Sequence, residues 1–316
     1  MVTGATGFVG RYIVRALLAK GMRPVCLVRS REKLFAQHPD VSEDRLVAVV
    51  GSMGDARALR EAADMSQAAI HLVGIIINRR LRGQTYDRIH RRGTVAVVDA
   101  VRSSKIKRYV HMSALGTRAD AVAEYHRTKW AAEQYVRTSE LDWTIFRPSI
   151  IHGPDGEFML LMKQFACGIL PPVIPYFGDG SARIQPVYVK DVAHCFVEAL
   201  LRPKTIGQTY ALGGPRAYTW KELYNACRAL IPGARKWKRL LGLPVPAAKA
   251  LAAVLGPPMA LVETVMPSAG LFRFNADQVT MSQEDALCDL GPAAEAFDIT
   301  MKSFEGELPA YADRIP

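Results

Sequence analysis

Three glycines at intervals of three residues open the chain, in the run Thr3-Gly4-Ala5-Thr6-Gly7-Phe8-Val9-Gly10. Without a Cβ, the first can make the tight turn off a strand, the second can let backbone approach a phosphate and the third can pack a helix closely on the sheet. A helical pattern over residues 10–20 follows, with its positive N-terminal end toward that phosphate. This order predicts a dinucleotide site, with an ordinary turn as the alternative. The expected contacts are Gly4, Thr6, Gly7, Phe8, Val9 and Gly10.

The end of the next apolar run indicates which dinucleotide is bound. It reads Leu27-Val28-Arg29-Ser30-Arg31, with no carboxylate to hold the ribose 2′-hydroxyl of NAD. Arg29, with Ser30 or Arg31, suits a 2′-phosphate instead. The sequence therefore favours NADP(H) over NAD(H), and the alternative is that Arg29 is an ordinary solvated loop residue.

Short apolar runs alternate with helical patterns through the first half of the chain. Such runs are typical of strands buried on both faces of a parallel sheet. The alternation predicts an α/β fold with a Rossmann, doubly wound parallel sheet. The expected strands are residues 25–28, 46–50, 69–73, 108–112 and 143–146, and the expected helices are residues 10–20, 86–103 and 122–138.

Beyond residue 150 the pattern changes, because prolines and glycines interrupt residues 148–186. Strand-like runs at 185–189 and 209–212, with a helix at 191–201 between them, are expected to return to the main sheet. We therefore expect an NAD(P)-binding domain at 1–155, with 184–215 returning to its sheet. Residues 156–183 and 216–316 would form a smaller, mostly helical cap for substrate or docking.

Composition narrows the classes of protein further. The 316 residues contain no apolar run long enough to span a membrane and no visible signal peptide, so we expect a cytoplasmic protein. Five scattered cysteines and scattered histidines, His152 among them, show no metal-ligand spacing and are expected to be structural. The net charge of +11 is concentrated partly in the run 235–239. It fits solvated surface, anionic lipid or an acidic partner, and no nucleic-acid module is present.

A tyrosine and a lysine lie one helical turn apart in Tyr125-His126-Arg127-Thr128-Lys129. On one face of a helix, the ammonium of Lys129 is expected to lower the pKa of Tyr125. Tyr125 could then exchange a proton while hydride moves to or from a nicotinamide. Ser113, after the fifth expected strand, could orient a substrate carbonyl. We therefore expect Ser113, Tyr125 and Lys129 to be catalytic.

These motifs stand in the order found in short-chain dehydrogenases/reductases, and the chain resembles the extended or atypical kind over residues 1–215. Within that superfamily it most resembles the NADPH-binding accessory subunit family of respiratory complex I. Residues 86–94, 141–149 and 183–189 carry this closer similarity. The resemblance implies that backbone of Pro148, Ser149, Ile150 and Ile151 holds the nicotinamide carboxamide, with Val73, Gly74 and Lys129 as further cofactor contacts.

Two positions depart from the superfamily. Sugar epimerases carry an asparagine where this chain has His90, which counts against that activity. Ser52 replaces the acidic residue that often follows the third strand, while Asp55 remains and is expected to cap the next helix.

Three functions therefore stay open. The first is an NADPH-dependent oxidoreductase acting on a lipid-like or quinone-like carbonyl or alcohol. The second is a non-catalytic subunit that holds NADPH in a respiratory complex, and the third is a nucleotide-sugar epimerase or dehydratase. The weakly charged stretch 240–274, behind its basic lead-in, is expected to be a cap helix or a surface that docks peripherally on an inner membrane or a partner subunit.

Overall fold

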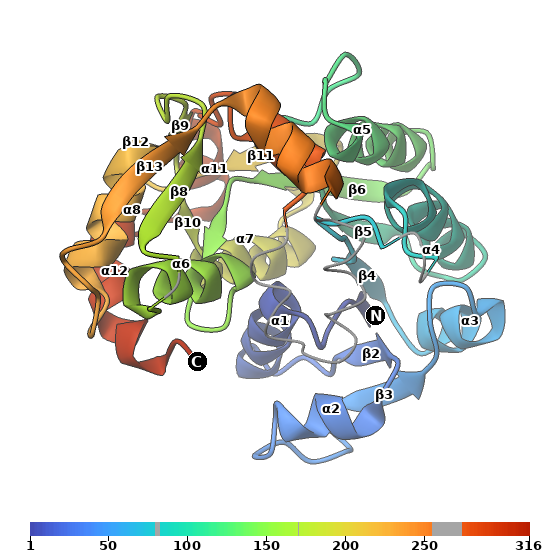
Figure 1. The fold of residues 1–316 in the computed structure, drawn as a ribbon. Helices are drawn as coiled ribbons and strands as arrows, with labels where there is room; N and C mark the ends of the chain where they lie inside the picture. The colour runs from blue at the N-terminus through green and yellow to red at the C-terminus, as the bar shows by residue number, and fades with distance from the viewer. Residues whose placement is uncertain (80–82, 170, 255–273) are drawn as a thin grey trace.

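The computed structural model describes residues 1–79, 83–169, 171–254 and 274–316, and at its centre lies a seven-stranded sheet (Figure 1). All of its neighbouring strands are parallel, in the order β11-β6-β5-β4-β1-β2-β3. The expected Rossmann architecture is confirmed. The strands are β1 (Val2–Thr3), β2 (Val25–Val28), β3 (Val47–Val50), β4 (Ala68–His71), β5 (Arg108–Met112), β6 (Asp142–Pro148) and β11 (Gln208–Leu212).

Helices cover both faces of this sheet, which explains why its strands are apolar without alternation. Along β2, Cys26 and Val28 join the core on one face, while Val25 and Leu27 join the core on the other. The first core contains residues of α1 (Phe8–Ala19), α7 (Val189–Leu201) and α11 (Gly291–Phe297). The second contains residues of α3 (Ala56–Asp64), α4 (Gly93–Arg102) and α5 (Glu124–Arg137).

Two expectations about these elements need correction. The helix expected over 86–103 begins with a π-helical turn, η2 (Asp87–Arg92), before α4. The strand expected at 185–189 is only β10 (Val187–Tyr188), and it pairs with β7 (Ile151–His152) in a separate two-stranded sheet. Only the later run, which forms β11, joins the main sheet.

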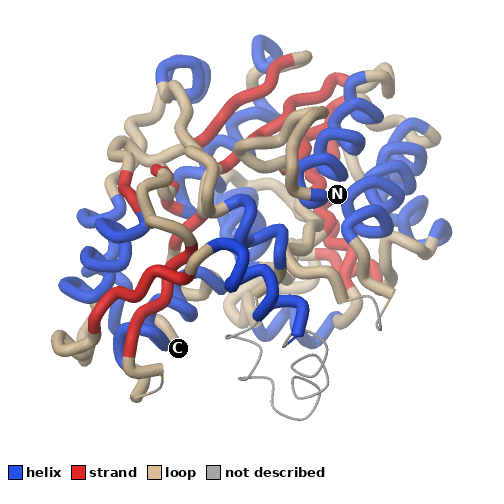
Figure 2. Tube along the Cα trace, turned by 45° about the horizontal axis from the view of Figure 1, so that its top comes forward, coloured by secondary structure: helices blue, strands red, loops and turns tan. Residues whose placement is uncertain are grey.

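Most of the elements after residue 150 build a second layer beside the sheet, around a third hydrophobic core, whereas α2 (Arg31–Ala36) packs on the core of the main sheet through Leu34. The parallel pair of β8 (Val173–Phe177) and β13 (Arg239–Leu243) in this second layer stands apart from the main sheet (Figure 2). A helix at residues 245–254 follows β13, and residues 255–273 of the expected docking stretch lie outside the described residues. The other elements are α6 (Glu157–Cys167), β9 (Arg183–Ile184), η3 (Pro203–Thr205), β12 (Tyr218–Thr219), α8 (Trp220–Leu230), α10 (Ala276–Met281), α12 (Phe304–Tyr311) and η5 (Ala312–Arg314).

No helix in the described part of the chain is both long and apolar enough to cross a lipid bilayer.

Candidate active site

The glycine turn joins β1 to α1 and depends on two of its glycines. Gly4 has a φ of +81°, which side-chain-bearing residues rarely adopt, and its carbonyl accepts the N–H of Gly7 at 3.0 Å. A Cβ on Gly10 would lie 2.1 Å from that same carbonyl oxygen. The third glycine therefore permits the helix to pack on the turn itself, rather than on the sheet as expected.

The first turn of α1 is left open for an anion. Its N-cap, Gly7, offers no side-chain cap, and the turn contains no acidic residue, so the amide groups keep their positive field. The Thr6 carbonyl accepts a hydrogen bond from Gln37 at 3.2 Å, which fixes the turn against the end of α2. The Phe8 ring points toward Gly156, since a Cβ on that glycine would lie 2.9 Å from the ring. The backbone at this turn fits a pyrophosphate.

The end of β2 holds one cation with no partner among the described residues. Arg29 is exposed, whereas Arg31 pairs with Glu43. Ser30 caps α2, since its hydroxyl accepts the N–H of Lys33 at 3.0 Å and lies 2.8 Å from a carboxylate oxygen of Glu32. Sequence reasoning missed this carboxylate because Glu32 follows directly after the stretch that suggested a phosphate site.

The carboxyl ends of β4 and β5 converge on the side chain of Lys129. Its ammonium donates to the carbonyl of Met112 at 3.0 Å, and a Cβ on Gly74 would lie 3.1 Å from it. Val73 lies beside the glycine turn, since its side chain would be 3.3 Å from a Cβ on Gly4. Burial lowers the pKa of Lys129 to about 8. Lys129 and the glycine turn thus meet at the carboxyl edge of the sheet, where β1 and β4 lie side by side. Ligands of such sheets usually bind in the crevice at this point.

Tyr125 is on the same helix as Lys129 but does not have the expected acidity. Burial raises the pKa of Tyr125 to about 12, so the prediction that Lys129 lowers it is wrong. Its hydroxyl has no hydrogen-bond partner in the described part of the chain. Ser113 is buried, and its hydroxyl lies 3.3 Å from that of Thr117.

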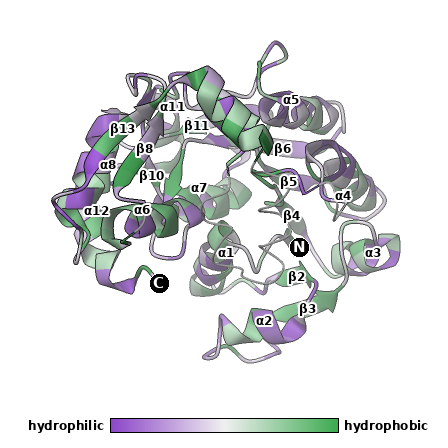
Figure 3. Ribbon diagram, in the orientation of Figure 1, coloured by the Kyte–Doolittle hydropathy of each residue, from purple (hydrophilic) through white to green (hydrophobic). Residues whose placement is uncertain are grey.

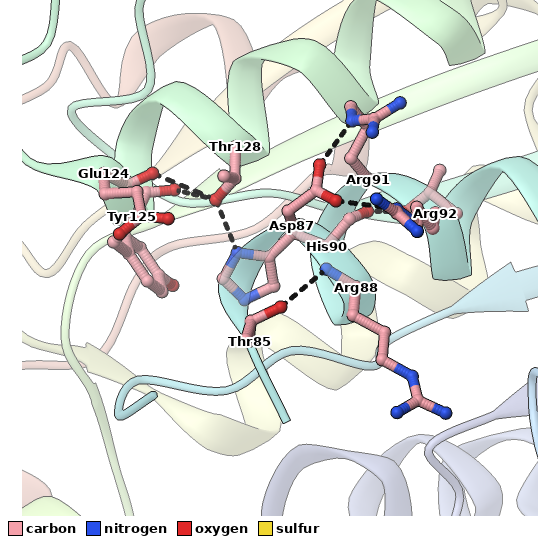
Figure 4. A network of polar contacts seen from close by, with 10 residues as sticks. Thr85, Asp87, Arg88, His90, Arg91, Arg92, Glu124, Tyr125 and Thr128 are labelled. Carbon is pink, nitrogen blue, oxygen red and sulfur yellow. Dashed lines mark hydrogen bonds and ion pairs between the residues drawn. The ribbon is translucent and has the colours of Figure 1, made fainter. Parts of the chain in front are cut away.

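His90 sits against Tyr125 from the π-helical turn, and this contact was not anticipated. Its imidazole meets the Tyr125 ring edge-on with centroids 5.2 Å apart (Figure 4). One ring nitrogen lies 2.9 Å from the Thr128 hydroxyl, and the other lies 3.1 Å from the amide nitrogen of Ile75. Burial lowers the pKa of His90 to about 2, so the ring is neutral. The sequence showed only that His90 stands where sugar epimerases carry an asparagine.

The segment after β6 has much of its backbone already paired. The Pro148 carbonyl accepts from Leu115 at 2.9 Å, and the Ser149 amide donates to Leu212 at 2.8 Å. The Ile150 carbonyl accepts from Val187, and Ile151 begins β7. The Ser149 hydroxyl is buried and, among the described residues, has no partner. That hydroxyl is therefore a polar group available to a ligand. The sequence had predicted that backbone atoms of this segment, and not a side chain, contact the cofactor.

Comparison with known proteins identifies the domain. A family model described as NAD(P)H-binding matches residues 4–164. The chain belongs to the NAD(P)H-binding family. Its cofactor is therefore a nicotinamide dinucleotide.

Relatives within the family confirm the expected resemblance. A ceramide reductase of Caulobacter vibrioides is 34% identical over 246 residues, covering 78% of this chain and 73% of that protein. Subunit 9 of the mitochondrial NADH dehydrogenase [ubiquinone] 1 alpha subcomplex of Arabidopsis thaliana is 30% identical over 302 residues, covering 90% and 70%. The NAD(P)H-binding chain is thus a short-chain dehydrogenase/reductase-like protein with similarity to complex I subunits.

Solved structures agree on the fold. UDP-glucose 4-epimerase of Thermotoga maritima superposes with a TM-score of 0.72 at 16% identity, covering 99% of this chain and 97% of the epimerase. dTDP-glucose 4,6-dehydratase of Bacillus anthracis gives 0.70 at 16% identity, covering 99% and 94%. At this identity the likeness shows the epimerase/dehydratase fold alone.

Several other candidate residues have structural partners. Asp55 caps α3 by accepting the N–H groups of Arg57 and Ala58, both at 3.1 Å. His152 is buried, with one ring nitrogen 2.8 Å from the Tyr311 hydroxyl. In the basic lead-in, the ammonium of Lys238 donates to a carbonyl at the end of α6 at 2.8 Å and is buried. That cation stabilises a helix C-terminus and is unavailable for docking.

Proposed function

We propose that this NAD(P)H-binding protein is an NADPH-dependent oxidoreductase that reduces a carbonyl group on a lipid-like molecule. The observation that carries the proposal is the convergence of Lys129, Gly74 and Met112 at the crevice beside the glycine turn. The similarity to a ceramide reductase favours a lipid over a sugar nucleotide. Residues 1–155 with 184–215 would hold the cofactor, and the layer built from 156–183 and 216–316 would hold the substrate.

The chain's own residues would divide the work of reduction. The reduced nicotinamide supplies the hydride. Tyr125 donates its proton to the carbonyl oxygen as the alcohol forms, and its high pKa keeps the phenol protonated beforehand. Lys129 binds the ribose hydroxyls and Ser113 orients the carbonyl. The paired backbone around Ser149 is held in place and would support the nicotinamide carboxamide.

NADPH would be preferred over NADH because Arg29 is exposed and, in the described part of the chain, has no acidic partner. The Glu32 carboxylate, bound to Ser30, is the feature that favours NADH. Arg29→Ala should therefore weaken NADPH binding and leave NADH binding nearly unchanged. Glu32→Gln is the matched variant and should favour NADPH further.

The test of the activity is NADPH consumption with a ceramide whose secondary alcohol has been oxidised to the ketone, presented in detergent micelles. A short-chain ubiquinone tests the quinone-like alternative. Tyr125→Phe should abolish turnover while NADPH still binds. Turnover that survives in Tyr125→Phe would contradict the proposed chemistry.

Similarity to complex I subunits supports a second candidate, a subunit that holds NADPH without turning it over. Nucleotide bound only by the folded state would then stabilise the protein. The rate at which NADPH leaves the purified protein separates the two functions. Release within seconds fits an enzyme, whereas retention through extensive dilution fits a structural cofactor. The sugar epimerase alternative has only the fold in its favour, since His90 fills the usual asparagine position.

Peripheral docking on an anionic membrane would bring a lipid-like substrate to this site. Trp237 is 58% exposed and Val254 70% exposed. The stretch 240–254 contains Lys249 as its one charged residue, and the helix after β13 is coloured mostly green to white, for apolar residues, in Figure 3. Lys236 and Arg239 are exposed beside the tryptophan and suit lipid phosphates. Trp237→Ser should reduce sedimentation with phosphatidylglycerol vesicles. Val50→Ser, at a valine 59% exposed on β3, is the control and should not.

A further inference from the structure

The chain segment that begins at Asn275 returns from the cap layer to the helix that carries Tyr125 and Lys129. α10 contains Asp277, whose carboxylate accepts the amide N–H groups of Glu124 and Tyr125, both at 3.2 Å. These contacts join residues 153 and 152 positions apart in the sequence. They therefore fix α5 to a part of the protein outside the NAD(P)H-binding domain.

This carboxylate replaces a cap that α5 does not have. The N-cap position is Ala123, which offers no side-chain acceptor. The first amide groups of a helix need acceptors and carry a positive field, so an anion there is stabilising. Asp277 meets both needs at the end of the helix where Tyr125 lies, one turn before Lys129.

Asn275 makes a second connection, to the rings that surround Tyr125. Its side-chain amide donates to the Tyr86 hydroxyl at 2.9 Å and to the Ile76 carbonyl at 3.2 Å. The Tyr86 hydroxyl itself donates to the Ile76 carbonyl at 2.7 Å. Tyr86 is buried, so this three-way arrangement holds its ring in one place.

The Tyr86 ring passes this restraint on to the tyrosine of the site. It stacks on His90 with centroids 5.4 Å apart and an interplanar angle of 19°. Both rings meet Tyr125 edge-on, at 5.8 Å from Tyr86 and 5.2 Å from His90. Because its hydroxyl has no partner in the described part of the chain, the Tyr125 side chain is placed by these ring contacts and by its helix.

We propose that Asn275 and Asp277 are positioning residues for Tyr125, Asp277 through the N-terminus of α5 and Asn275 through the stacked rings of Tyr86 and His90. The proposal deepens the proposed function, because it assigns residues of the cap layer to the same site. The cap layer thereby completes the environment of the proton donor.

The test places a single 3-fluorotyrosine at position 125 and records its ¹⁹F resonance in the full-length protein. Asp277→Ala and Asn275→Ala should each shift and broaden that resonance. Asp277→Asn keeps one acceptor oxygen and should give an intermediate shift. Thr280→Ala is the matched control on α10, since among the described residues that hydroxyl bonds only within its own helix, to the Ala276 carbonyl. The ¹⁹F resonance of Thr280→Ala should coincide with that of the unaltered protein.

This readout requires no substrate, so it separates the positioning role from the proposed activity. If both alanine variants remain folded by circular dichroism and their resonances match that of Thr280→Ala, the proposal is wrong. If an alanine variant fails to fold, the resonance of Asp277→Asn tests the proposal instead, and a resonance that matches that of Thr280→Ala would contradict it. Where a ketone substrate is turned over, the alanine variants should lower kcat roughly 10- to 100-fold with the KM for NADPH unchanged. Absence of turnover with a shifted resonance would contradict the enzyme proposal alone.

Discussion

At the residue scale, the site depends on backbone positions that cannot carry a side chain and on the burial of a few polar groups. Gly74 is one such case, because a Cβ there would crowd the ammonium of Lys129. Lysine and glycine come from segments far apart in the sequence, so their contact could not be read from the motifs alone.

Gly74→Ala should therefore displace Lys129 and weaken NADPH binding. The added Cβ would stand 3.1 Å from the ammonium and 3.7 Å from His90, which is itself held on both sides. Isothermal titration with NADPH measures the change. Gly54→Ala is the control, since its Cβ would meet nothing closer than 3.7 Å. Equal affinities in the two variants would show that Lys129 is not a cofactor contact.

The high pKa of Tyr125 sets different pH dependences for the two directions of the proposed reaction. Reduction uses the neutral phenol, which predominates at every pH below about 12, so its kcat should not fall through ionisation of Tyr125 between pH 6 and 9. Alcohol oxidation uses the phenolate, whose population rises about tenfold per pH unit below that pKa. Initial rates in both directions measure this. A reduction rate that falls with a midpoint near pH 7 would show that bound nucleotide lowers the pKa of Tyr125.

At the element scale, the alternation of apolar runs and helical patterns predicted strands β2 to β6 and β11 of the main sheet, although it also placed residues 185–189 there wrongly. It worked because residues buried on both faces leave a continuous apolar signal. The π-helical turn at Asp87–Arg92 could not be predicted, since it depends on His90 reaching both Thr128 and Ile75. The Asp277 cap of α5 likewise depends on tertiary folding and leaves no local pattern.

A helix cap made by a residue next to its own helix can be predicted from the sequence, because the capping residue and the capped amide groups lie within a few residues of each other. Asp55→Ala should lower the free energy of unfolding by about 1 kcal/mol, since two amide groups of α3 lose their acceptor. Urea denaturation measures it, and NADPH affinity should not change. Asp64→Ala, at the other end of α3, removes a charge that the helix field disfavours and should be neutral or stabilising. A loss of NADPH affinity in Asp55→Ala would indicate that Asp55 also contacts the nucleotide.

At the scale of the whole molecule, buried neutral histidines link stability to pH. Burial lowers the pKa of His71 and His152 to about 3, of His90 to about 2 and of His126 to about 4, and that of His111 well below its usual range. The unfolded chain takes up protons near pH 6.5, whereas the native protein does not until about pH 4 or below. Protonation therefore favours the unfolded state across this interval.

The free energy of unfolding should consequently fall as the pH drops from 6.5 to about 4. Each such histidine adds a slope of up to about 1.4 kcal/mol per pH unit. Urea denaturation at pH 7, 6 and 5 measures the slope, and His152→Gln should reduce it by about one proton. Stability that stays constant over this range would mean that these rings are already charged in the native protein.

The first turns of α1 belong to two hydrophobic cores at once. Val9 and Tyr12 pack against the core of the sheet and also against the core of the cap layer, and Arg11 pairs with Asp155 at 3.2 Å. A nucleotide held at the start of this helix would therefore be coupled to both cores. Heating should then melt the two layers together, in a single cooperative transition whose midpoint rises with the concentration of NADPH.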